Sequence, residues 1–200
     1  MGQKRIAAVS NKPAHFVAPL FFENQLERPY AVRMKDSLPE ILWRQFGGAL
    51  KTLEDAIVAC PEDVWGSELK DNQFWFLAYH TLIWTDFYAS ETTENFRPPA
   101  PFSLGEIPIG HLPERVYSKA ELLRYLEFDF EKSRRLIRSL TPEKAEQRFV
   151  CEFKNFNLLE LVIYNTRHVQ HHAAQLNLLL RQRVGEPPGW SSLPARGLYD

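Results

Sequence analysis

The longest helical pattern in the sequence, residues 157–184, holds three of the six histidines of the chain. An α-helix turns about 100° per residue, so His168 and His172 lie about 40° apart on one face, one turn from each other. The same face carries Leu161 and Leu176, which predicts that it packs inward. An unpaired nitrogen in an apolar interior costs about 1–3 kcal/mol. The fold must therefore supply both imidazoles with hydrogen-bond partners or a metal.

Two other helices are predicted from their start signals. Ser37 and Ser118 are each followed by glutamate three residues later, which is the pattern of a capping box. Apolar residues then recur at helical spacing, which predicts helices over about 38–59 and about 118–140. For the long helix at 157–184, Asn157 and Glu160 provide the start signal, and Gly185 the end.

A further helix is predicted between the two capping boxes. Asp71 or Asn72 can cap it, and it carries His80 and Trp84 on one face. The stretch that follows, residues 90–117, contains five prolines and is predicted to be a long loop. Such a loop is long enough to cross the height of a helical bundle and to join two parallel helices.

The four helices predict an all-α protein, a four-helix bundle in up-down-down-up order. Residues 149–153 alternate and can be extended, but no convincing hairpin signal appears. A hydrophobic content of 44% over 200 residues is enough for one core. We therefore expect a single domain over 1–200, with the bundle at about 37–184. Residues 1–36 form an N-terminal arm and residues 185–200 a C-terminal tail anchored by Trp190.

Composition excludes several classes of partner. The 24 Lys and Arg residues nearly balance the 25 Asp and Glu residues, and no basic block predicts nucleic-acid binding. The two cysteines lack a CxxC spacing, which fits a reducing compartment. Residues 1–10 show no apolar stretch of the kind found in a secretory leader, and no run of 18 apolar residues occurs in the sequence. We expect a soluble, cytoplasmic protein that does not bind a membrane.

His80, His168 and His172 are the candidate metal ligands, because all three project from predicted inward faces. Three protein ligands that leave open positions are typical of catalytic sites, and an all-nitrogen set suits Zn²⁺, Ni²⁺, Co²⁺ or Fe²⁺. The alternative is that each imidazole is a core residue satisfied by hydrogen bonds. His171 points about 100° away and flanks the site, and Gln175 lies one turn beyond His172.

Other motifs fail on spacing. The ExxH pairs of di-iron bundles are missing, since Asn165 precedes His168 by three residues, and the HExxH motif is absent because Val169 follows His168. Asp129 lies near the inward stripe of its predicted helix. It is a candidate to support the metal site, or it is a solvent-facing edge residue.

These residues resemble the DinB/YfiT-like superfamily, whose members carry one histidine on the second helix and HxxxHxxQ on the last. Here the positions are His80, His168, His172 and Gln175, and the resemblance covers about residues 37–184. The chain departs from the family at one place. Between the last histidine and the glutamine the family often has Arg-Gly, whereas this chain has Ala-Ala.

The resemblance implies an up-down-down-up bundle, often dimeric, that holds Ni²⁺ or Zn²⁺. It implies a metal-dependent transferase that uses a low-molecular-weight thiol such as bacillithiol or glutathione on a small-molecule substrate. Two alternatives stay open. One is a metal-dependent hydrolase with His171 or Asp129 as proton shuttle. The other is a non-enzymatic stress-response or binding protein with a structural metal.

Overall fold

Two capping boxes start the first and fourth helices, as predicted. The computed structural model describes residues 36–66, 74–94, 96–104, 113 and 115–200. Helix α1 spans Leu38–Ala59, and the backbone N–H of Ser37 donates to Glu40 Oε2 over 2.7 Å. Helix α4 spans Lys119–Arg138 and has the same reciprocal bonds at its own capping box. The short helix α2, Glu62–Trp65, follows α1.

Helix α6 spans Leu158–Val184 and confirms the longest predicted helix. The Glu160 N–H donates to Asn157 Oδ1 over 2.8 Å, and the helix ends at Gly185, whose φ of 92° suits glycine. Helix α3 spans Phe74–Tyr88, where a helix was predicted. The predicted caps of that helix, part of the proline-rich loop and residues 1–35 of the predicted arm lie outside the described residues.

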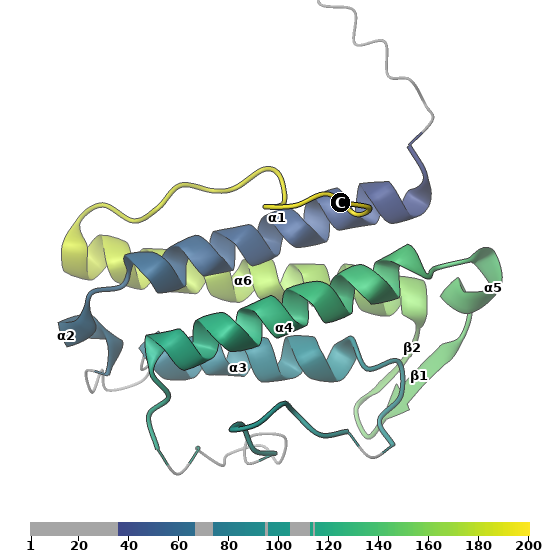
Figure 1. Ribbon diagram of the computed structural model, residues 1–200, viewed down its shortest axis with the longest axis horizontal. Coiled ribbons are helices and arrows are strands. Elements are labelled where there is room, and N and C mark those ends of the chain that lie inside the picture. Colours follow the sequence, from purple (N-terminus) through teal and green to yellow (C-terminus); the bar gives the residue numbers. More distant parts are fainter. Residues whose placement is uncertain (1–35, 67–73, 95, 105–112, 114) are drawn as a thin grey trace, which may run out of the picture. The chain divides into compact units, whose positions relative to one another are not determined.

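The described part of the chain is mostly helical, as predicted for the all-α class. Helix α1 packs against α4 and α6, and α3 packs against the same two helices. Helices α3 and α4 run in one direction, and α1 and α6 run in the other (Figure 1). The core between them is rich in aromatic side chains with at most 1% exposure: Trp43, Phe46, Phe74, Tyr79, Tyr125 and Phe149. None of the described helices is both long and apolar enough to span a bilayer.

A short β-hairpin precedes α6, so the expectation that the chain has no hairpin is wrong. After the short helix α5, Pro142–Ala145, strand β1, Arg148–Cys151, pairs antiparallel with β2, Lys154–Asn157. The predicted extended segment is confirmed over residues 149–151, whereas residues 152 and 153 form the turn. The turn lacks an Asn-Gly or similar pair, which is why no hairpin signal was visible. Instead the hairpin is held by packing, since Phe149 is 1% exposed.

After α6 the chain turns back and runs along α1 (Figure 1). Trp190 is not the buried anchor that was predicted, because it is 71% exposed. The buried apolar side chain of this segment is Leu198, at 4% exposure, and the Trp43 indole N–H donates to the Arg196 carbonyl over 2.9 Å. The buried Leu198 side chain and the Arg196 carbonyl therefore hold the segment in the way that was expected of Trp190.

Candidate metal centre

Three histidines from two packed helices come together. His80 lies on α3, and His168 and His172 lie one turn apart on α6. One ring nitrogen from each lies within 4.8 Å of the other two. The ring centroids are 4.7 Å apart for His168 and His172, and 4.8 Å apart for His80 and His172. This convergence is what the helical spacing predicted.

The histidines lie beside the fully buried stripe of α6, not on it. The expectation that they are buried in the core is therefore wrong, since all three are only partly buried. The buried stripe comprises Leu158, Leu161, Val162, Asn165, Val169, Ala173, Leu176 and Leu180. Val169 and Ala173 each follow a histidine directly and lie about 100° from it around the helix, so His168 and His172 lie at the edge of the stripe and not at its centre. That offset points them toward a cavity, where a ligand can reach them.

A hydrogen bond fixes the protonation of one imidazole. His172 Nδ1 lies 2.6 Å from Gln175 Oε1. A carboxamide oxygen can only accept, so Nδ1 carries the proton and Nε2 keeps its lone pair for a metal. His168 Nδ1 is buried and has no hydrogen-bond partner among the described residues. A buried nitrogen without a partner fits a site that is completed by an ion.

Burial keeps two of the rings neutral. Burial, together with the neighbouring imidazoles, lowers the pKa of His168 to about 2. It also lowers the pKa of His172 to about 4, although the Gln175 bond acts in the opposite direction. Both rings are therefore neutral at pH 7, and neutral imidazole is the form that binds a metal. The residues present fit a divalent transition metal in donor type and in protonation state.

The histidines line a cavity of about 1310 Å³. Six aromatic side chains line it: Phe76, Trp84, Tyr88, Phe153, Tyr164 and Trp190. Arg167 also lines it, and no Asp or Glu does so among the described residues. The cavity therefore suits an apolar ligand that is neutral or anionic.

The other predicted site residues lie in different places. His171 lines the cavity with its ring centroid 5.0 Å from that of His172, and it does not belong to the three-nitrogen group. Asp129 is fully buried on α4, so the solvent-edge alternative is wrong. It is not among the described residues that line the cavity, and its charged neighbours are Asp86 and Lys132.

Part of the cavity wall was not foreseen from the sequence. Trp84 and Phe76, one turn on either side of His80, and Tyr164, one turn before His168, line the cavity as helical spacing predicts. Phe153 comes from the hairpin turn and Trp190 from the C-terminal segment. No periodic pattern links those two residues to the histidines, since their positions depend on tertiary packing.

The chain matches a known protein family over most of its described length. Residues 38–176 match the family model described as the DinB superfamily. The matched segment contains His80, His168, His172 and Gln175, and it ends before the C-terminal segment. A comparison with curated proteins found no match.

Proposed function

The chain belongs to the DinB superfamily, and from this premise we propose that it holds one divalent transition metal, Ni²⁺ or Zn²⁺, on His80, His168 and His172. The observation that carries the proposal is the meeting of three imidazole nitrogens within 4.8 Å beside a large cavity. Three protein ligands leave coordination positions open, which is the usual arrangement of a catalytic metal. A purely structural zinc is normally closed by four ligands.

The proposed architecture around the metal is a four-helix bundle in up-down-down-up order. Its support is the packing of α1 and α3 each against both α4 and α6, together with the helix directions in Figure 1. In this arrangement α3 and α6 are neighbours, which is the condition for His80 to meet the other two histidines. The family resemblance further supports a homodimer, and the two cysteines without a CxxC spacing support a cytoplasmic location.

For the reaction, the proposal is S-transfer from a low-molecular-weight thiol to a small electrophile. A bound metal would supply a Lewis acid that holds the thiol as thiolate at neutral pH. The thiol proton passes to solvent, and the thiolate sulfur forms a bond to an electrophilic carbon, whose leaving group departs with the electron pair of the broken bond. Arg167 provides a positive charge at the cavity wall, where an anionic thiol is favoured, and the aromatic walls suit an apolar electrophile.

Metal-dependent hydrolysis is the second candidate, because His171 lines the cavity beside the metal ligands and could move protons there. The absence of a carboxylate among the described lining residues favours transfer. A protein with a structural metal is the third candidate.

The test is the spectrum of untagged protein loaded with Co²⁺. Glutathione, bacillithiol or cysteine at millimolar concentration should produce a sulfur-to-metal charge-transfer band, and the His172→Ala variant should not show it. A response to small anions but to no thiol would favour hydrolysis. If neither class of ligand changed the spectrum, the metal would be structural and the transferase proposal would be wrong.

A further inference from the structure

The C-terminal segment, residues 186–200, forms one wall of the metal cavity. Trp190, Ser191 and Ser192 line the cavity together with residues of α1, α3 and α6. Ser191 is tied to α1, because its backbone N–H donates to Thr52 Oγ1 over 3.2 Å and its hydroxyl to Asp55 Oδ2 over 3.0 Å. This wall lies outside the segment that matches the family model.

Two glycines on α1 let the segment lie close to the helix. A Cβ atom at Gly48 would lie 3.2 Å from the Ser191 carbonyl oxygen, and one at Gly47 would lie 2.5 Å from Pro194 Cβ. The second distance is shorter than any real Cβ contact, so a side chain at Gly47 would have to push the segment away. The Gly-Gly pair thus sets the distance between the segment and α1.

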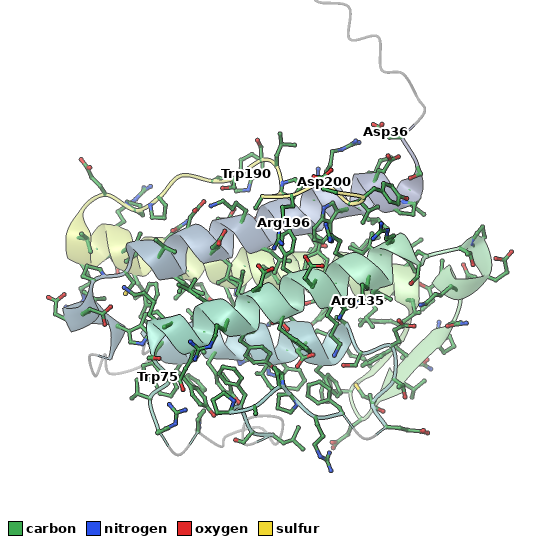
Figure 2. The ribbon with its side chains drawn as sticks, viewed as in Figure 1. Asp36, Trp75, Arg135, Trp190, Arg196 and Asp200 are labelled. Carbon is green, nitrogen blue, oxygen red and sulfur yellow. The ribbon has the colours of Figure 1, made fainter. Side chains whose placement is uncertain are left out.

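Further along, the segment is fixed at two more points. Arg196 forms ion pairs with Glu127 over 2.7 Å and with Glu131 over 3.3 Å, both on α4, and Leu198 is buried. Figure 2 shows Trp190 and Arg196 on this segment as it runs along α1. The segment is thereby held on both α1 and α4, which fixes the position of the wall that it contributes.

Trp190 has a large apolar surface that the core does not use. It is 71% exposed, yet it lines the cavity, and its indole N–H donates to Gln170 Oε1 of α6 over 3.3 Å. The bond to Gln170 orients the ring at the cavity wall. An exposed indole held in one orientation is a favourable surface for a flat apolar group, because the contact removes apolar surface of both the indole and the ligand from water.

We propose that Trp190 determines which ligands the metal cavity accepts, and that it selects molecules with an aromatic or other flat apolar group beyond the metal-binding end. The inference rests on the proposed metal site. The selectivity of the cavity then comes from the C-terminal segment, which lies outside the part of the chain that matches the family model.

The test compares probes that share a metal-binding end and differ in the ring. One series is ω-phenylalkylthiols with one to four methylene groups against alkylthiols of the same chain length. The second is 1-phenylalkylimidazoles against 1-alkylimidazoles, which bind a metal without thiol chemistry. Dissociation constants come from titration of Co²⁺-loaded, untagged full-length protein. In the wild type, the best phenyl probe of each series should bind about tenfold more tightly than the alkyl probe of the same chain length. This corresponds to a difference in binding free energy of about 1.4 kcal/mol.

Three variants test whether the preference for a ring depends on Trp190 or on the rest of the C-terminal segment. Trp190→Ala should lose most of the tenfold preference and keep its affinity for the probes without a ring. Gly47→Ala should show the same loss, because it displaces the segment without changing any residue that lines the cavity. Leu193→Ala is the matched control, since Leu193 is an exposed apolar residue of the same segment that does not line the cavity, and it should keep the preference.

The outcomes distinguish this inference from the proposed function. A ring preference in the imidazole series, with no thiol binding, would support the role of Trp190 and contradict the thiol reaction. Equal affinities within both series in the wild type, or an unchanged preference in Trp190→Ala, would overturn the inference even if thiols bind the metal.

Discussion

A single hydrogen bond decides how His172 can act. Gln175 accepts from Nδ1, so the lone pair of the ring is on Nε2, and the bond also holds the ring in place. The helical spacing of these residues made a contact between them foreseeable, since Gln175 lies three residues after His172. The spacing could not give the tautomer, which depends on the distance and on the acceptor atom.

Replacing Gln175 with Leu should weaken metal binding by about 10- to 100-fold, because the ring loses the acceptor that orients it. Gln175→Glu keeps an acceptor oxygen at the same position and is the matched control. Competition with a chromophoric chelator measures both affinities. Equal losses in the two variants would show that the side chain acts by its packing and not by accepting the bond.

Replacing His172 with Ala should abolish stoichiometric metal and leave the helical content unchanged. His171→Ala should keep the metal, because His171 lies outside the three-nitrogen group. The measurements are elemental analysis and circular dichroism. Loss of metal in His171→Ala comparable to that in His172→Ala would mean that the ligands on α6 have been assigned wrongly.

At the scale of elements, α3 and α4 are joined through buried polar side chains. Asp86 on α3 accepts from the Tyr125 hydroxyl over 2.8 Å and forms an ion pair with Lys132 of α4. Asp129 is buried beside them, and neither of its oxygens has a hydrogen-bond partner among the described residues. Burial, reinforced by the charge of Asp86, raises the pKa of Asp129 well above its ordinary value.

This raised pKa makes the stability depend on pH. The folded protein keeps the proton on Asp129 at pH values where the unfolded chain has released it, so folding takes up a proton. The stabilising contribution is fully present below the ordinary aspartate pKa of about 3.9 and is lost as the pH rises toward the folded pKa. Urea unfolding between pH 5 and pH 8 should therefore show a decline in stability that is smaller in Asp129→Asn.

Asp86→Asn is the contrasting variant. It leaves Lys132 without its carboxylate partner and should lower the free energy of unfolding by about 3 kcal/mol at neutral pH.

If Asp129→Asn left the pH dependence of the unfolding free energy unchanged, the buried carboxyl of Asp129 would not be the group that takes up the proton.

At the scale of the whole molecule, local signals predicted the helices and long-range packing decided the rest. Capping residues and apolar spacing gave the bounds of α1, α4 and α6 almost to the residue, because these signals act within one turn of the chain. The same spacing predicted the meeting of the three histidines. It misjudged their burial, since Val169 and Ala173 take the buried stripe.

The hairpin and the path of the C-terminal segment were missed for a different reason. Phe149 is buried by the fold around it and not by a turn motif, and Leu198 joins the buried core from outside any helix or strand. Trp190 looked like an anchor because large aromatic residues are usually buried. Its exposure at the cavity is what connects the segment to the candidate site.

The central claim is that His80, His168 and His172 together bind one metal. X-ray absorption spectroscopy of untagged protein reconstituted with one equivalent of Ni²⁺, and separately of Zn²⁺, tests it most directly. We expect scattering from three imidazole ligands per metal, with the remaining positions filled by water or other small ligands, and one fewer imidazole in His80→Ala. A spectrum with one imidazole or none, or one that His80→Ala leaves unchanged, would contradict it.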